Sequence, residues 1–384
     1  MLLRPVLSLA FVCAAAVAGP ELRPIPSIGW VYFGTSTTGP GTGLFVAAFD
    51  EATGVLGNPR LAAEIPNPVF QAIAPNGRFL YSLGDRPGPD GTRLGAIHAF
   101  AINRDTGVLT PIGVRSTVGL EPAHINVEPG GRFLVTANYN GGFATVYPIL
   151  PDGSAGPETG HVQHTGSGPN HDRQQAPHAH SVNYDPSGRF ALVADLGLDQ
   201  VRVYKLDAAH GLMAPNDPPF GQTPPGAGPR HLAFSPSGRF VYVADEISSS
   251  VTVFAWDGSR GTLTPLQTEP MLPPDYHGPL NTAAEIAVHP SGRWLYVSNR
   301  GDDSLVAFSI DSATGRISFL QRMGAGIKCP RNFAIDPSGH WIVCANRDLD
   351  NAIVLRIDPD TGRLSSTTQA VHVPQSICVR FLRP

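Results

Sequence analysis

A Pro-x-Gly tripeptide followed by Arg or His recurs six times along this chain, at intervals of 47 to 57 residues. Proline fixes φ and glycine accepts a positive φ, so each tripeptide carries the chemistry of a tight turn. Each copy lies between two β-prone runs, such as His231–Phe234 and Phe240–Val243. The prolines are Pro75, Pro129, Pro186, Pro236, Pro290 and Pro337. A hairpin that returns with this period predicts a repeat protein built from β-sheets.

A second turn alternates with the first. It begins with Asp or Asn and ends four residues later with Gly, and a shorter version, Pro151-Asp152-Gly153, fills one gap. The other six copies span residues 50–54, 103–107, 207–211, 257–261, 311–315 and 358–362. Seven turns of this kind and six of the other predict units of four strands. The order in each unit is strand, Pro-x-Gly turn, strand, loop, strand, Asp turn, strand.

The two ends of the chain complete this pattern. The unit that begins at Trp30 lacks its first strand, whereas the strand-like run Ser376–Phe381 has no second strand after it. We therefore expect an all-β fold, a seven-bladed β-propeller over residues 26–384. Each blade has four antiparallel strands, and one blade is closed by the N- and C-terminal strands. Closing the ring removes the sheet edges on which other chains could pair.

The first residues have a different character. Arg4 precedes a mostly apolar run, Val6–Ala18, which ends in the A-x-A pattern Ala16-Val17-Ala18. A basic start, a short apolar stretch and small residues at the cleavage point are typical of a secretory signal peptide. We expect residues 1–18 to be a signal peptide and the protein to be exported, either to the periplasm or out of the cell.

Composition narrows the range of partners. The formal net charge is -4, charged residues make up 15% of the chain and no basic run occurs, which argues against nucleic acid. After the N-terminal segment, no run is apolar for long enough to span a membrane. The spacing of Cys329, Cys344 and Cys378 fits neither a disulfide framework nor a metal site. We expect a monomer without metal or cofactor, with Cys344 and Cys378 as small core residues.

The first strand of each propeller unit lines the central channel, and the loops before it and after the second strand open on one face. Polar residues that recur at this face are interpreted as caps bonded to local backbone: Asn138, Asp195, Asp245, Asn299 and Asn346. The arginines after the Pro-x-Gly turns, on the opposite face, are interpreted as structural or solvated. The residues that break the repeat are His178, His180, Arg230, Glu246, Glu285, Arg300 and Arg331.

These exceptional residues indicate a site for an anion. Guanidinium groups bind carboxylate or phosphate through charge-assisted pairs, and three arginines would meet here. Glu246 and Glu285 could orient them, and a nearby histidine could be a general base because its pKa lies near neutrality. Three Pro- and Gly-rich insertions, residues 152–176, 215–228 and 269–282, are expected to build up the same face. No GxSxG elbow or HExxH motif occurs, so a serine esterase and a zinc hydrolase are poorly supported.

Four stretches carry a family resemblance: PHAHSVNYDPSGRFALVADLGLDQV, GPRHLAFSPSGRFVYVADE, AAEIAVHPSGRWLYVSNRGDDSL and PRNFAIDPSGHWIVCANRD. The chain resembles the lactonases with a seven-bladed β-propeller, a family that includes 6-phosphogluconolactonases and a carboxy-cis,cis-muconate cyclase. The likeness covers most of the chain from Trp30 onward. It implies an active site at the mouth of the channel, with the catalytic residues His180, Arg230, Glu246 and Arg300. His178, Glu285 and Arg331 are expected to bind the substrate.

The first hypothesis is a hydrolase that opens a small anionic sugar lactone, foremost 6-phospho-D-glucono-1,5-lactone. His180 would activate water, Arg230 and Arg300 would hold the phosphate or the oxyanion, and Glu246 would orient an arginine or shuttle a proton. Two alternatives keep the same site. One is a muconate-type cyclisation, in which the arginines hold substrate carboxylates. The other is an exported propeller that binds a sugar acid or a protein without turnover.

Overall fold

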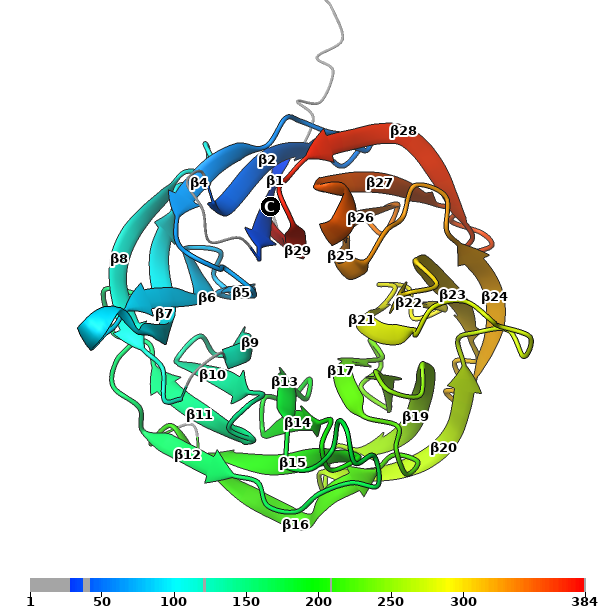
Figure 1. Ribbon diagram of the computed structural model, residues 1–384, viewed down its shortest axis with the longest axis horizontal. Helices are drawn as coiled ribbons and strands as arrows, with labels where there is room; N and C mark the ends of the chain where they lie inside the picture. Colours follow the sequence, from blue (N-terminus) through cyan, green and yellow to red (C-terminus); the bar gives the residue numbers. More distant parts are fainter. Residues whose placement is uncertain (1–27, 37–41, 120–121, 208, 383–384) are drawn as a thin grey trace, which may run out of the picture.

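The computed structural model describes residues 28–36, 42–119, 122–207 and 209–382. These residues form seven antiparallel sheets that stand around a central axis, and the chain passes from blade to blade around the ring (Figure 1). The prediction of an all-β, seven-bladed propeller is confirmed. The signal peptide expected over residues 1–18 lies outside the described residues.

Six blades consist of four consecutive strands each, which run in order from the channel outward. Three of them are β5 (Gln71–Ile73), β6 (Phe79–Pro87), β7 (Arg93–Ile102) and β8 (Leu109–Ser116); β9 (Pro122–Val127), β10 (Phe133–Asn138), β11 (Phe143–Pro148) and β12 (Gly160–Gln163); and β13 (Ala179–Tyr184), β14 (Phe190–Asp195), β15 (Gln200–Asp207) and β16 (Leu212–Gln222). The other three are β17 (Pro229–Phe234), β18 (Phe240–Asp245), β19 (Ser250–Asp257) and β20 (Thr262–Pro270); β21 (Thr282–Val288), β22 (Trp294–Arg300), β23 (Ser304–Ile310) and β24 (Ile317–Met323); and β25 (Pro330–Ile335), β26 (Trp341–Asn346), β27 (Asn351–Ile357) and β28 (Leu364–His372).

The seventh blade joins the two ends of the described chain. From the channel outward its strands are β29 (Ser376–Leu382), β1 (Ile28–Thr35), β2 (Gly43–Asp50), and the short strands β3 (Val55–Leu56) and β4 (Arg60–Glu64), which both pair with β2. β29 runs antiparallel to β1, with Trp30 opposite Leu382 and Thr35 opposite Ser376. The C-terminal strand therefore supplies the innermost strand that the first unit lacks, as the sequence predicts (Figure 1).

The two recurrent turns meet at the interfaces between blades. Gly261, which ends an Asp turn, has a φ of +71°, and a Cβ placed on it would lie 2.4 Å from the ring of Phe190 in the preceding blade. Arg189 lies over that ring and donates to the carbonyl of Gly258 in the same Asp turn. The other six interfaces repeat the glycine–aromatic contact: Gly54–Trp341, Gly107–Trp30, Gly153–Phe79, Gly211–Phe133, Gly315–Phe240 and Gly362–Trp294. This arginine is thus structural, in agreement with the prediction for its class.

Two of the polar residues that recur at the ends of the second strands accept hydrogen bonds from the backbone of rim loops. Asn138 Oδ1 accepts a hydrogen bond from the backbone N–H of Gly141 at 2.7 Å. Asp195 Oδ1 accepts from the backbone N–H groups of His178 at 2.8 Å and Gly197 at 3.0 Å. These two residues are therefore caps that fix the rim loops, as their repetition indicates.

The core lies between neighbouring blades, where apolar sheet faces pack against each other. Val253 of β19, for example, shares a buried cluster with Leu295 of β22. Cys344 and Cys378 are fully buried in clusters of this kind, as expected for small core residues. In the part of the chain that the structure describes, no helix has the length and apolar character needed to cross a membrane.

Two of the three insertions contain more strand than expected. β12 occupies residues 160–163 of the first insertion, and β16 continues through the second as far as Gln222, because each serves as the outermost strand of its blade. These two insertions are therefore partly strand. Residues 164–178, 223–228 and 271–281 remain as connections to the next inner strand. The first of these connections brings Arg173 to the mouth of the channel.

Candidate active site

A β-bulge near the start of the inner strand aims one side chain into the mouth of the channel in several blades. The ladder between β13 and β14 skips His180, and the corresponding ladders skip Arg230 in β17 and Arg331 in β25. Ala123 in β9 and Ile377 in β29 are skipped in the same way. A bulge redirects a side chain and is common beside functional sites. We call these five residues the upper ring.

The upper ring lines a cavity of about 480 Å³. Tyr139 and Glu246 come from the loops that directly follow β10 and β18, Arg300 is the last residue of β22, and the connection before β13 contributes Arg173. A concave space of this size, with a few convergent polar groups, suits a small-molecule ligand. Five of the residues predicted for the site share this lining: His180, Arg230, Glu246, Arg300 and Arg331.

Glu246 is held by three arginines. Its Oε2 accepts hydrogen bonds from Nε of Arg230 and Nη2 of Arg300, both at 2.9 Å. Its Oε1 accepts from Nη2 of Arg173 at 2.6 Å. Arg230 and Arg300 also donate to backbone carbonyls of β21, each at 2.8 Å. The carboxylate thereby fixes guanidinium groups that come from three different blades or connections.

These contacts determine the protonation state of Glu246. Burial alone would raise the pKa of the carboxyl, but the guanidinium groups of Arg300 and Arg230 outweigh burial and lower the pKa to about 2. Glu246 is therefore an anion at neutral pH and has no proton to give. Its position suits it to orienting arginines, and a single carboxylate among three guanidinium groups leaves the cluster positively charged.

Arg331 adds a fourth guanidinium to the cavity wall. It forms no hydrogen bond or ion pair with any residue that the structure describes. Burial, together with the nearby Arg300, lowers the pKa of Arg331 to about 10, so it remains charged at neutral pH. Burial and the guanidinium groups of Arg300 and Arg331 also lower the pKa of Arg230. An anionic ligand would relieve this repulsion, so the cavity favours anions.

His180 faces this positive surface as a neutral imidazole. It is 6% exposed, and its Nδ1 atom is enclosed without a hydrogen-bond partner among the described residues. Burial lowers the pKa of His180 well below its ordinary value, and Arg230 and His231 lower it further. The ring is therefore unprotonated at neutral pH, which is the form that can accept a proton.

His178 lies behind the cavity wall. Its ring stacks on Tyr139 with the centroids 4.4 Å apart, and its Nδ1 is 2.9 Å from the backbone oxygen of Tyr139. Tyr139 does line the cavity, and its hydroxyl accepts a hydrogen bond from Arg173 Nη2 at 3.3 Å. The structure thus places His178 where it supports Tyr139, and an effect of His178 on a ligand would be transmitted through that ring.

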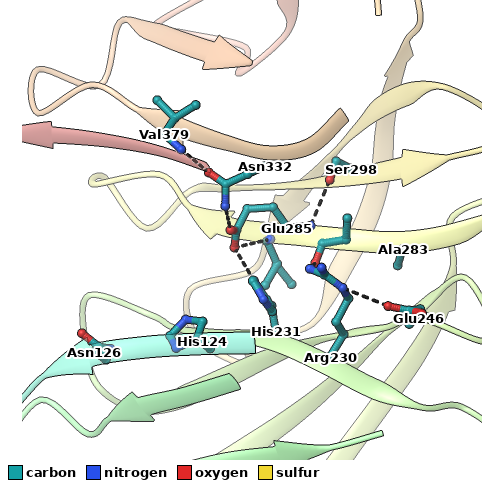
Figure 2. A network of polar contacts seen from close by, with 12 residues as sticks. His124, Asn126, Arg230, His231, Glu246, Ala283, Glu285, Ser298, Asn332 and Val379 are labelled. Carbon is teal, nitrogen blue, oxygen red and sulfur yellow. Dashed lines mark hydrogen bonds and ion pairs between the residues drawn. The ribbon is translucent and has the colours of Figure 1, made fainter. Parts of the chain in front are cut away.

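Deeper in the channel lies a second layer of polar side chains, which we call the lower ring: His124, His231, Glu285 and Asn332 (Figure 2). Oε1 of Glu285 is 3.0 Å from Nδ1 of His231, and Oε2 accepts a hydrogen bond from Nδ2 of Asn332. The backbone N–H of Val379 donates to Oδ1 of Asn332 at 2.9 Å. Glu285 lines a second cavity of about 570 Å³ and is absent from the lining of the first, whereas His231 lines both.

The cavity wall also contains residues that were not among the predicted site residues, including Arg173, Tyr139 and His231. Arg173 lies in an insertion that no repeat aligns, so its register could not be inferred from the sequence. Tyr139 directly follows the cap Asn138 at the end of β10. His231 directly follows Arg230 in the motif GPRH. Its place next to Arg230 on the inner strand β17 was the sequence signal that could have identified it as a site residue.

Comparison with known proteins agrees with this architecture. A family model described as "Lactonase, 7-bladed beta-propeller" matches residues 30–381. A 6-phosphogluconolactonase of Bacillus subtilis is 33% identical over 351 residues, covering 91% of this chain and 97% of that protein. A 6-phosphogluconolactonase of Formosa agariphila is 31% identical over 303 residues, covering 77% and 82% respectively. The solved structure of a periplasmic gluconolactonase from Pseudomonas aeruginosa has a TM-score of 0.86 at 35% identity, covering 92% of this chain and 99% of that one. The chain therefore belongs to the lactonase family with a seven-bladed β-propeller.

Proposed function

We propose that this protein hydrolyses a sugar lactone, with 6-phospho-D-glucono-1,5-lactone as the substrate. The observation that carries the proposal is a neutral histidine beside an excess of guanidinium groups. His180 shares one cavity with Arg230, Arg300 and Arg331, and Glu246 compensates only part of their charge. The names of the relatives support this substrate class, since the Bacillus subtilis relative is named 6-phosphogluconolactonase.

Hydrolysis requires a base for the attacking water. In the proposed reaction, Nε2 of His180 takes a proton from water while the water oxygen bonds to the carbonyl carbon of the lactone. The tetrahedral intermediate then loses its bond between that carbon and the ring oxygen, and the imidazolium returns the proton to the ring oxygen. The product is a hydroxy acid, which gives its carboxyl proton to solvent. A general base of this kind contributes about 10²–10⁴-fold.

The arginines are proposed to stabilise the oxyanion of the intermediate and to bind the substrate phosphate. Because Glu246 holds Arg230 and Arg300 in place, their N–H groups are oriented before the oxyanion forms. One well-placed donor to an oxyanion is worth about 3 kcal/mol. Arg331, which has no partner among the described residues, is assigned to the substrate phosphate.

A second candidate substrate is the same lactone without its phosphate. The similar structure from Pseudomonas aeruginosa is named a periplasmic gluconolactonase, and the N-terminal sequence of this chain has the pattern of an export signal. A periplasmic or secreted location would favour this non-phosphorylated substrate. The two substrates differ only at the anionic end, so they share the proposed chemistry at the carbonyl.

The test is a pH-stat assay of the mature protein on both lactones, corrected for spontaneous hydrolysis. His180→Ala and Arg230→Ala are each expected to lower the rate by at least about tenfold while the circular dichroism spectrum is unchanged. Arg260→Ala, on an exposed turn of the opposite face, is the matched control and should retain the full rate. Rates like the wild type in both site variants would remove the mechanism. A wild-type protein without lactone hydrolysis but active on muconates in an ultraviolet assay would point to cyclisation.

A further inference from the structure

Two enclosed imidazole nitrogen atoms beside the cavity have no hydrogen-bond partner among the described residues. They are Nδ1 of His180 and Nε2 of His231. The two rings are neighbours, with their centroids 5.2 Å apart and their planes inclined by 67°. Leaving a buried polar atom unpaired is costly, so two such atoms on adjacent rings call for a common explanation.

The other nitrogen of His231 fixes its tautomer. Nδ1 lies 3.0 Å from Oε1 of Glu285 (Figure 2). Burial favours the neutral acid, but the contact with His231 lowers the pKa of Glu285 below its ordinary value. Glu285 is thus an anion that can only accept, so Nδ1 of His231 carries the proton and Nε2 presents an electron pair. His180 can donate to that electron pair if its own proton is on Nδ1.

We propose that Glu285, His231 and His180 form a relay across three blades, in which Glu285 and His231 are positioning residues for His180. When Nε2 of His180 accepts a proton from water, its Nδ1–H donates to Nε2 of His231, and the carboxylate of Glu285 stabilises the resulting positive charge. The inference rests on the proposed function, because the role of His180 as a base belongs to it. Hydrogen bonds of a catalytic site often tighten only when substrate is bound.

The charges around the two rings explain why such support is needed. The charged groups that lower the pKa of His180 are cationic and disfavour an imidazolium: Arg230, Arg331 and Arg300. Those that face His231 are Arg230, Arg380 and Glu285, and Glu285 is the anion among them. Glu246 is already bound by three guanidinium groups. Glu285 is therefore the carboxylate placed to balance a proton on His180.

Two variants remove the relay without emptying the channel. Glu285→Gln keeps the size of the side chain and removes its charge, and His231→Asn keeps a donor near Nδ1 and removes Nε2. Each is expected to lower kcat for lactone hydrolysis by about ten- to a hundredfold with little change in KM. The double variant should be no slower than the slower single variant, because residues that act as a unit are not additive.

A pH profile separates this role from a structural one. Loss of the Glu285 charge lowers the pKa of the base, so the acid limb of kcat/KM should move to lower pH in Glu285→Gln. A residue that only supports the fold would not move this limb. Glu128→Gln is the matched control, since Glu128 is also buried but pairs with Arg132 outside both cavities. It should leave kcat and the pH profile unchanged.

Nitrogen-15 spectra of histidine-labelled protein test the relay without any substrate. Both His180 and His231 are expected as Nδ1–H tautomers. An Nε2–H tautomer of His180, unchanged kinetics in both single variants, or independent effects in the double variant would overturn the relay while lactone hydrolysis stands. A wild-type protein that hydrolyses no lactone would instead remove the proposed function, and with it the catalytic use of the relay.

Discussion

Nε of Arg230 lies 2.9 Å from Oε2 of Glu246, at the open end of a single hairpin in which Arg230 is near the start of β17 and Glu246 directly follows β18. Both are almost fully buried, with exposed fractions of 3% and 6%. The bulge at Arg230 turns its side chain toward the channel, where the carboxylate that follows β18 can reach it. Breaking one side of such a buried pair leaves an uncompensated charge, so the site and the stability of the protein depend on each other.

Removing Glu246 should destabilise the fold. Glu246→Ala leaves the guanidinium groups of Arg173, Arg230 and Arg300 without their shared anion. We expect the free energy of unfolding in urea to fall by about 3–5 kcal/mol. Asp348→Ala removes one partner of an exposed ion pair with Arg347 and should cost less than about 1 kcal/mol. Equal losses in the two variants would contradict the importance of the buried cluster.

Asp245 should make stability depend on pH. Burial raises the pKa of this carboxyl to about 7, against an ordinary value of 3.8, and the hydroxyls of Thr252 and Ser250 offset only part of that effect. A pKa that is higher in the folded state gives stability that is present below the ordinary value and is lost as pH rises through about 7.

Asp245→Asn should therefore remove the decline in stability between pH 5 and pH 8. At pH 8 the variant should be more stable than the wild type, by at most about 4 kcal/mol. Urea unfolding at the two pH values measures this difference. Asp105→Asn, at an exposed turn, is the control and should show the pH dependence of the wild type. A decline that persists in Asp245→Asn would show that another group causes it.

The contact between blades at Gly261 can be tested with a paired substitution. Gly261→Ala adds a Cβ 2.4 Å from the Phe190 ring at a φ of +71°, whereas Gly91→Ala has a φ of +73° and nothing within 4 Å. The backbone alone costs about 1–2 kcal/mol at a left-handed position. Gly261→Ala should lower the free energy of unfolding by clearly more than Gly91→Ala, since the ring must also move. Similar losses of unfolding free energy in the two variants would mean that the interface between the blades accommodates the added methyl group without further destabilisation.

Arg331 should discriminate between the two candidate substrates. A charge-assisted contact with the phosphate is worth about 1.5–3 kcal/mol, so Arg331→Ala should raise KM for the phosphorylated lactone by about ten- to a hundredfold. KM for the non-phosphorylated lactone should change much less. Initial rates over a range of both lactones measure this difference, with Arg260→Ala as the control. Equal increases for both substrates would assign Arg331 to another part of the lactone.

The sequence by itself determined the number of blades, their strand order and the way in which the ring closes. The reason is that each type of turn requires characteristic residues, which can be recognised in the sequence. The spacing between Pro236, Asp257 and their equivalents then shows how many strands lie between the turns. It also indicated the face of the ring that carries Arg230 and Glu246, because the alternation of strand directions dictates which loops meet.

Only the tertiary structure decided how deep each side chain lies in the channel. A shift of one residue in register changes where a side chain points, and the bulges that set this shift at His180 and Arg331 leave no mark in the strand pattern. Glu285 was therefore expected beside Glu246 but lies a layer below it, bonded to His231. Arg173 could not be placed at all from the sequence, because the contact that fixes it, with Glu246, joins residues 73 positions apart.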